Sequence, residues 1–217
     1  DERGQHIEIH GSQETYRTHL PLLGDYQIEN AAAAIGAIET LSNRGVTIPG
    51  DSIAQGLSRV VWPARLQKIT CTKSALVDGA HNPDSMRRLM NAIQDNFEFR
   101  HLYVVFGTGV GHLTDKMFAE LCRFSPLVIA VKSRDPRAAS AERVACMSRN
   151  VGLKVVGKHA NVADGVREGV SLAGDGDIVL GTGSLFVAAE MIEELEGIQP
   201  EIYLGLEKQF SRMGGSI

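Results

Sequence analysis

The pattern of hydrophobic and polar residues changes once along the chain and divides it into two regions. Residues 6–20 hold two stretches of alternating polarity around a Gly/Ser turn, which predicts a β-hairpin. Residues 30–41 are Ala-rich, which predicts a helix with Asn30 as its N-cap, and a shorter helix is expected over residues 51–57. Because a lone hairpin does not fold in water, we expect residues 1–61 to be the end of a domain that begins upstream.

From residue 62 onward, short β-branched runs alternate with amphipathic helical stretches. This alternation predicts an α/β domain over residues 62–217, with a mostly parallel sheet of about six strands flanked by helices. The expected strands are residues 66–71, 75–77, 102–106, 128–131, 153–156 and 177–180. The expected helices are residues 84–97, 114–124, 141–150, 161–172 and 184–195. Ligands of such sheets collect beyond the carboxyl ends of the strands, so the residues that follow each strand are candidates for a site.

Composition excludes several classes of protein. The chain has 217 residues, a formal charge of −4, 43% hydrophobic and 22% charged residues, values close to the average for globular domains. A slightly acidic chain with 6% aromatic residues gives no reason to expect a nucleic-acid partner, and no apolar run approaches the length that spans a membrane. Three widely spaced cysteines fit neither a disulfide framework nor a metal site, which favours a reducing, cytoplasmic compartment.

Chemistry-bearing segments follow two of the early strands. Residues 78–82 include the Asp78 carboxylate, which can accept hydrogen bonds from ribose hydroxyls, and the His81 imidazole, which can donate one to a phosphoryl oxygen. A turn and a helix cap explain Asp78 and Asn82 equally well. Residues 107–112 contain three glycines that permit close approach of the backbone to a ligand, although a plain flexible loop fits the same residues.

Two further strand ends carry groups that suit anions. Residues 132–137 include two arginines, which fit either an anionic ligand or an ordinary charged surface. Residues 181–184 open a helix whose free amides favour an anion, and a glycine-rich turn is the alternative. Residues 152–159 match G-x-x-x-x-G-K, but they end in His159 and their spacer has the pattern of a strand, so we reject a phosphate-binding loop there.

Taken in order, these segments resemble the Mur ligase superfamily, and most closely the folylpolyglutamate synthase/dihydrofolate synthase family. The family motifs are L-L-G-x-H-Q-x-x-N-A, W-P-G-R-L, D-G-A-H-N-P, V-F-G, P-R-A and T-G-S-L. Their counterparts here are Leu22–Ala31, Trp62–Leu66, Asp78–Pro83, Val105–Gly107, Pro136–Ala138 and Thr182–Leu185. Tyr26 stands where the family has His, and Ala64 where it has Gly. The resemblance implies a Rossmann-like C-terminal domain, preceded by the tail of a central ATPase domain.

The resemblance also implies a function, part of an ATP-dependent carbon–nitrogen ligase that adds L-glutamate to a folate or dihydropteroate through an acyl phosphate. The nucleotide-binding residues that it implies are Gln27 and Asn30 near adenine, Asp78 at the ribose, and Arg65 and His81 at the phosphates, the last two being catalytic. The substrate-binding residues that it implies are Ser133, Arg137 and Ser184. The ligands of Mg²⁺ and the phosphate-binding loop belong to the N-terminal ATPase domain of the parent chain, so residues 1–217 alone are expected to be inactive.

Three alternatives stay open. The first is a Mur-type ligase that acts on a peptidoglycan precursor, although the D-G-A-H-N-P form favours the folate branch by resemblance. The second is a nucleotide-binding or regulatory module without catalysis, because this sequence has no phosphate-binding loop. The third is an NADP-dependent oxidoreductase that uses residues 107–111 and Arg134, but the dinucleotide-binding fingerprint is incomplete.

Overall fold

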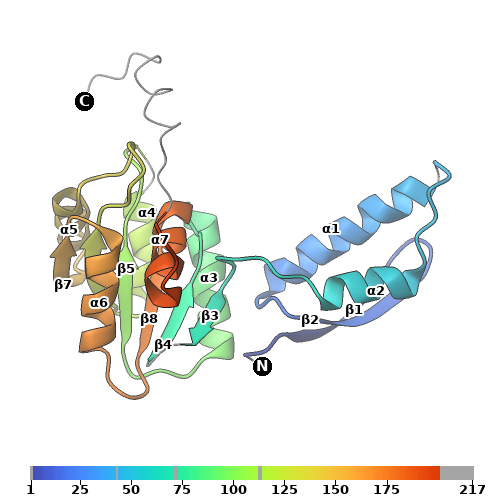
Figure 1. Cartoon of the computed structure of the whole chain (residues 1–217), viewed down its shortest axis with the longest axis horizontal. Helices are drawn as coiled ribbons and strands as arrows, with labels where there is room; N and C mark the ends of the chain where they lie inside the picture. The colour runs from blue at the N-terminus through green and yellow to red at the C-terminus, as the bar shows by residue number, and fades with distance from the viewer. Residues whose placement is uncertain (1, 43, 71–72, 112–113, 201–217) are drawn as a thin grey trace, which may run out of the picture. The chain divides into compact units, whose positions relative to one another are not determined.

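Two compact units make up the chain in the computed structural model (Figure 1). The structure describes residues 2–42, 44–70, 73–111 and 114–200. The first unit consists of Asp1–Arg65 together with Asn91–Phe97, and the second consists of Leu66–Met90 together with Glu98–Ile217.

The first unit contains the expected hairpin and two helices. Strands β1 (Gln5–His10) and β2 (Thr15–Leu20) pair in antiparallel register, and they are followed by helices α1 (Asp25–Ser42) and α2 (Gly50–Ser58). Alternate residues of the hairpin pack against buried residues of the helices. The resulting core consists of Ile7, Ile9, Tyr16, Leu20, Ala31, Ile35 and Ile53.

Helix α1 begins five residues earlier than the sequence pattern predicted, so the assignment of Asn30 as its N-cap is wrong. Gly24 has a φ of +97°, which ends the preceding extended segment, and Asp25 opens the helix with a negative charge in its first turn. The buried positions Gln27, Ala31, Ile35 and Glu39 recur every four residues. Because a polar side chain at position 27 occupies the buried stripe, hydrophobicity alone did not indicate the first turn.

The second unit is a six-stranded sheet, and the predicted α/β fold is confirmed. Its strand order is β3-β4-β8-β5-β6-β7, and β3 is antiparallel to β4 while the other neighbours are parallel. The strands are β3 (Gln67–Thr70), β4 (Ser74–Val77), β5 (Leu102–Phe106), β6 (Leu127–Val131), β7 (Lys154–His159) and β8 (Ile178–Thr182). The G-x-x-x-x-G-K segment lies largely in β7, which agrees with its rejection as a phosphate-binding loop.

Helices cover both faces of this sheet (Figure 1). They are α3 (Pro83–Asn96), α4 (Thr114–Cys122), α5 (Ala141–Asn150), α6 (Val162–Leu172) and α7 (Leu185–Glu196). The chain runs outward from β5 through α4 to β6 and through α5 to β7, and then returns through α6 to β8. Right-handed crossovers in opposite directions place α4 and α5 on one face and α6 on the other, and α7, which follows the last strand, packs beside α6.

The return to β8 creates a switch point in the middle of the sheet. The connection after β8 leads to α7 on one face, whereas that after its neighbour β5 leads to α4 on the opposite face. Ligands of open α/β sheets bind where the connections diverge in this way. The segments that follow β4, β5 and β8 are therefore brought together at the place where a site is expected.

Candidate functional site

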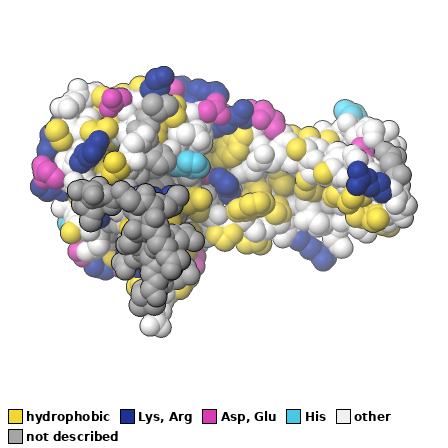
Figure 2. All heavy atoms as spheres, turned by 90° about the horizontal axis from the view of Figure 1, so that it is seen from above, with side chains coloured by type: hydrophobic (Ala, Val, Ile, Leu, Met, Phe, Trp, Pro, Cys, Tyr) yellow, Lys and Arg dark blue, Asp and Glu magenta, His cyan; other side chains and the backbone are white. Residues whose placement is uncertain are grey.

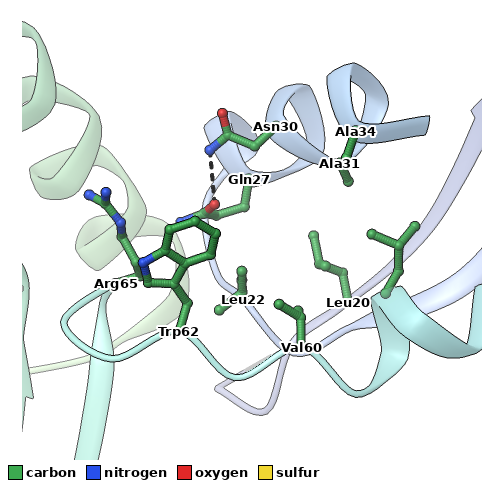
Figure 3. A pocket seen from close by; sticks show the side chains of 10 residues that line it. Leu20, Leu22, Gln27, Asn30, Ala31, Ala34, Val60, Trp62 and Arg65 are labelled. Atoms are coloured by element: carbon green, nitrogen blue, oxygen red, sulfur yellow. Dashed lines mark hydrogen bonds between the residues drawn. The ribbon is translucent and has the colours of Figure 1, made fainter. Parts of the chain in front are cut away.

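A cavity of about 400 Å³ lies within the first unit (Figure 3). One part of its wall is apolar, and the other carries polar or aromatic groups. The apolar residues are Leu20, Leu22, Ala31, Ala34, Leu57 and Val60, and the others are Gln27, Asn30, Trp62 and Arg65. A mostly apolar cavity of this size with a few placed polar groups is typical of a small-molecule site.

Gln27 and Asn30 form a hydrogen-bonded pair in the wall of this cavity. The Asn30 Nδ2 group donates to Gln27 Oε1 over 3.0 Å (Figure 3). The Gln27 side chain is only 4% exposed, and its Nε2 group has no hydrogen-bond partner. A buried donor without an acceptor costs about 1–3 kcal/mol, so an acceptor beside this amide would stabilise the protein.

Trp62 and Arg65 lie at the polar end of the cavity. The Arg65 guanidinium carbon lies 5.9 Å from the centre of the Trp62 ring, within range of a cation–π contact. Ala64, between them, has a φ of 58°, a left-handed conformation that favours glycine. The structure therefore explains why a glycine is usual at this position in the motif.

Asp78 follows β4 in the second unit and is 4% exposed. Its Oδ2 atom accepts from the Leu66 main-chain amide, and its Oδ1 atom accepts from that of Ala80, each over 2.8 Å. Leu66 has a φ of 44°, so the carboxylate holds a strained backbone. Asp78 therefore shapes this turn, and its role at a ribose stays a prediction.

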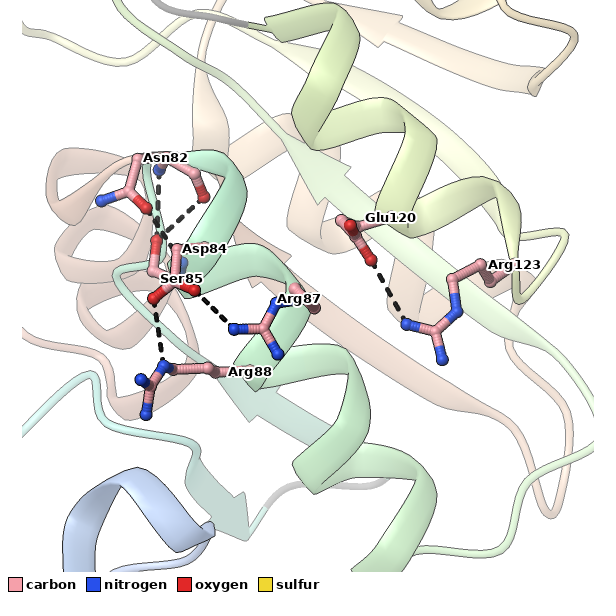
Figure 4. Close-up of polar contacts among 7 residues, drawn as sticks. All are labelled: Asn82, Asp84, Ser85, Arg87, Arg88, Glu120 and Arg123. Carbon is pink, nitrogen blue, oxygen red and sulfur yellow. Dashed lines mark hydrogen bonds and ion pairs between the residues drawn. The ribbon is translucent and has the colours of Figure 1, made fainter. Parts of the chain in front are cut away.

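His81 and Asn82 lead from this turn into α3. The His81 ring is exposed, with its Nδ1 atom 2.9 Å from the Gly79 carbonyl oxygen. Asn82 Oδ1 accepts from the Ser85 amide over 2.9 Å, which is the geometry of a helix cap (Figure 4). Hydrogen bonds from Arg87 and then from Arg88 lower the pKa of Asp84 in the first turn of the same helix.

Backbone hydrogen bonds join the segments after β4, β5 and β8. The Gly183 amide donates to the Ala80 carbonyl oxygen over 3.0 Å, and the Gly107 amide donates to that of Thr182 over 3.4 Å. A Cβ atom at Gly183, whose φ is +97°, would lie 2.6 Å from the Gly107 carbonyl oxygen. Glycine is therefore required there. Ser184 caps α7 by accepting from the Phe186 amide over 3.1 Å.

The two arginines after β6 both pair with carboxylates, and their role at a ligand stays a prediction. The Arg134 amide donates to Glu190 over 2.7 Å, and the Arg134 guanidinium pairs with Glu193 over 2.5 Å. Burial raises the pKa of Glu190, and this amide opposes the rise. Arg137 pairs with Asp135 of its own loop. Ser133, by contrast, is buried in the same segment, with 6% exposure.

The loop after β5 holds a residue that the sequence reasoning missed. Thr108 is 3% exposed, and its hydroxyl has no hydrogen-bond partner. Its carbonyl oxygen accepts from the Ala139 amide over 2.8 Å, and the Val110 amide donates to the Arg137 carbonyl oxygen over 2.9 Å. The glycines drew attention to this loop, but its hydroxyl carries no motif. The last residue of the predicted segment, His112, lies outside the described residues.

The distribution of surface charges and of potential metal ligands also bears on what the candidate site can bind. Lys and Arg side chains are interspersed with Asp and Glu side chains on the face drawn in Figure 2. Within the described part of the chain, no group of three or more His, Cys, Asp or Glu residues is placed to hold a metal ion. None of the helices described there is both long and apolar enough to cross a membrane.

Residues 64–185, more than half of the chain, match the family model "Mur ligase, glutamate ligase domain". The chain belongs to this family of ligase domains. A probable bifunctional folylpolyglutamate synthase/dihydropteroate synthase of Halobacterium salinarum is 30% identical over 187 residues, which cover 85% of this chain and 22% of that protein. A UDP-N-acetylmuramoyl-L-alanyl-D-glutamate--2,6-diaminopimelate ligase of Agrobacterium fabrum is 29% identical over 188 residues, which cover 82% of this chain and 36% of that protein.

A solved structure is similar over nearly the whole chain. The Mycobacterium tuberculosis folylpolyglutamate synthase complexed with ADP superimposes with a TM-score of 0.79 and 26% identity, covering 92% of this chain and 46% of that chain. The likeness to folylpolyglutamate synthases inferred from the motifs is therefore confirmed. This chain spans less than half the length of each of these relatives.

Proposed function

We propose that this chain is the C-terminal portion of an ATP-dependent ligase that adds L-glutamate to a folate or to dihydropteroate. Membership of the glutamate ligase domain family and the likeness to a folylpolyglutamate synthase complexed with ADP support this function. The observation that carries the nucleotide part is the unpartnered Nε2 donor of Gln27 in the wall of a base-sized cavity.

The Gln27–Asn30 pair favours adenine among the purine bases. Because Asn30 Nδ2 donates to Gln27 Oε1, the pair offers the Gln27 Nε2 donor and the Asn30 Oδ1 acceptor. Adenine presents an amino donor beside a ring-nitrogen acceptor, which matches this couple, whereas the same edge of guanine presents two acceptors. The apolar wall of the cavity and the Trp62 ring provide surfaces on which a planar base stacks.

The remaining assignments follow the family likeness. In this proposal Asp78 binds the ribose, and Arg65 and His81 neutralise charge on the phosphates. The folate carboxylate takes the terminal phosphoryl group of ATP, and the glutamate amine then displaces phosphate to form the amide. Ser133, Arg137 and Ser184 bind on the substrate side. No described residue is assigned to Mg²⁺, because none belongs to a suitable ligand cluster; its ligands are assigned to the upstream domain.

Nucleotide titrations of the 217-residue chain test the base assignment. We expect adenosine nucleotides to bind at least tenfold more tightly than guanosine nucleotides, and Gln27→Leu to remove this preference. Gln55→Leu, at an exposed position of α2, is the matched control and should leave both affinities unchanged. Equal affinity for the two bases, or an unchanged preference in the Gln27 variant, would contradict the assignment.

The division of labour between this chain and the upstream domain is tested separately. We expect no ligation by residues 1–217, because the phosphate-binding loop is assigned to the upstream part of the parent chain. Glutamate-dependent ATP hydrolysis by this chain alone would overturn that assignment. The measurement is release of phosphate with and without L-glutamate.

A peptidoglycan-precursor ligase is the second candidate, because the Agrobacterium relative shares 29% identity over most of this chain. The parent protein, supplied in turn with dihydropteroate, a reduced folate and a muramoyl peptide, distinguishes the two. Amide formation only with the muramoyl peptide would replace the folate assignment.

A further inference from the structure

The outward face of the β1–β2 hairpin carries only polar side chains. Successive residues of a strand point to opposite faces, so the neighbours of the buried Ile7 and Ile9 point away from the core of the first unit. The cross-strand pairs on the outward face are His6–His19, Glu8–Arg17 and His10–Thr15. A hollow of about 470 Å³ is lined by the first two of these pairs and by the residues between them.

His6 and His19 are direct partners in the antiparallel register, and their rings meet across the two strands. The ring centres lie 5.1 Å apart, and the ring planes are inclined by 64°. Two imidazoles that bind one tetrahedral zinc ion through bonds of about 2.0–2.1 Å have ring centres about 5 Å apart. The pairing of the strands therefore places these two imidazoles at the separation that one zinc ion requires.

The ring nitrogens of this pair also differ from those of the other histidines that the structure describes. Each of the others has a ring nitrogen between 2.6 and 3.1 Å from an oxygen atom, and these histidines are His10, His81, His101 and His159. Within the described part of the chain, His6 and His19 contact each other, and no hydrogen bond engages either ring. A neutral imidazole offers one nitrogen lone pair to a metal ion, so this pair has two such nitrogens uncommitted.

We propose that His6 and His19 form a surface site for an imidazole-preferring divalent cation such as Zn²⁺, with water in the remaining coordination positions. Imidazole suits zinc, copper and nickel, whereas Mg²⁺ takes oxygen ligands, so this site is separate from the Mg²⁺ of the proposed ligation and does not depend on that function. Glu8 is not assigned as a ligand, because its carboxylate accepts from Arg17 Nε over 2.6 Å.

A bound ion would join the two strands of the hairpin. The sheet of the first unit has only these two strands, and an isolated two-stranded hairpin is marginally stable in water. Because a ligand that binds only the folded state raises its stability, occupancy of this site would stabilise the first unit. The expected role of the ion is therefore structural.

Zn²⁺ binding to the metal-free 217-residue chain tests the site directly. We expect isothermal titration calorimetry to show one Zn²⁺ bound at this pair, and His6→Phe and His19→Phe each to weaken that binding at least tenfold. Phenylalanine keeps a ring at each position, so these variants report on the nitrogens and not on packing. His10→Ala on the same face is the matched control and should keep the wild-type affinity. Cys146→Ser, which removes an exposed thiol, should keep it as well.

Thermal unfolding gives a second readout. Free Zn²⁺ at about 100 times its Kd should raise the Tm of the wild type by about 5–10 °C. The same concentration of Mg²⁺ should not change the Tm, and Zn²⁺ should not raise the Tm of His6→Phe. An equal rise in the wild type and in His6→Phe would contradict a stabilising ion at this pair.

The outcomes distinguish coordination from packing. Unchanged Zn²⁺ affinity in both Phe variants would exclude the site and leave the pair as a ring contact. A comparable loss in His10→Ala would contradict the assignment to this pair. His19→Cys supplies another zinc ligand and should bind more tightly than His19→Phe; equal affinities would exclude direct coordination at position 19. If His6→Phe does not fold, His6→Gln should show the same loss of binding.

Discussion

The two units use buried polar side chains in two contrasting ways. Glu39 in the first unit and Asp78 in the second are buried carboxylates whose oxygens accept from main-chain amides. Gln27 in the first unit and Thr108 in the second are buried, but each has a polar atom without a partner. The satisfied groups hold backbone segments in place, and the unsatisfied ones mark where a ligand is expected. Burial alone does not distinguish these roles, whereas the presence or absence of a hydrogen-bond partner does.

The units also differ in how they bury apolar surface. The first packs a two-stranded hairpin against two helices around a small core. The second encloses a six-stranded sheet between helices on both faces, and its central strand β8 is buried at every residue. A small unit buries a smaller fraction of its surface and has less stability to lose. We therefore expect substitutions in the two units to change the stability of the protein by different amounts.

The largest effect is expected in the core of the second unit. Phe118 is fully buried, and its ring centre lies 4.8 Å from that of Phe106. Phe118→Ala should lower the free energy of unfolding by about 3–5 kcal/mol, because it removes contacts and leaves a cavity. Urea denaturation followed by circular dichroism measures the loss. Leu172→Ala, at an exposed site on α6, should stay within about 0.5 kcal/mol of the wild type; similar losses in both variants would contradict the assigned core.

The next effect concerns the buried carboxylate of the second unit. Asp78→Ala leaves the Leu66 and Ala80 amides without their acceptor, which should destabilise the protein by about 1–3 kcal/mol. Asp84→Ala, at an exposed position of α3, is the control and should destabilise the protein much less, because solvent screens exposed ion pairs. Equal stability of the Asp78 variant and the wild type would mean that the carboxylate does not hold this turn. Nucleotide kinetics of the variant are informative only alongside this measurement.

A smaller effect of opposite sign is expected at the strained position of the first unit. Ala64→Gly should stabilise the protein by about 1 kcal/mol, because its φ of 58° carries a penalty for every residue with a Cβ atom. Ala33→Gly, on an exposed helical position of α1, should destabilise it by about 1 kcal/mol. Thermal unfolding measures both changes. The same sign for both substitutions would exclude backbone strain at Ala64.

The last prediction is a pH dependence that concerns the buried carboxylate of the first unit. Hydrogen bonds from Gln13, Ser12 and Tyr16 lower the pKa of Glu39 to about 2 from an ordinary value of 4.5. Its contribution to stability is therefore complete above about pH 4.5 and is lost as the pH falls toward 2. Glu39→Gln should flatten the pH dependence of Tm in this window, whereas Glu29→Gln on the same helix should not. A wild-type Tm that does not fall between these pH values would contradict the assignment.

Local patterns predicted most of the secondary structure. Period-two alternation indicated the hairpin, and helical spacing indicated α5, α6 and α7 to within about a residue at their starts, because Ser140, Asn161 and Ser184 act as N-caps. The sequence pattern did not predict the first turn of α1, because the polar side chain of Gln27 occupies a buried position there. Strand-then-helix alternation was sufficient for the mostly parallel sheet, because each crossover element needs a sheet face to bury its apolar stripe.

The sequence by itself determined the fold class and the family, because periodicity and the order of short motifs are local properties of the chain. Only the tertiary structure decided which polar groups are already paired. Arg134 contacts α7 more than fifty positions along the chain, and Arg137 contacts its own loop. The sheet order brings these segments together, and no local pattern encodes that order. Unpaired buried groups, Gln27 in the first unit and Thr108 in the second, therefore indicate candidate positions for a ligand in each unit as much as the motifs do.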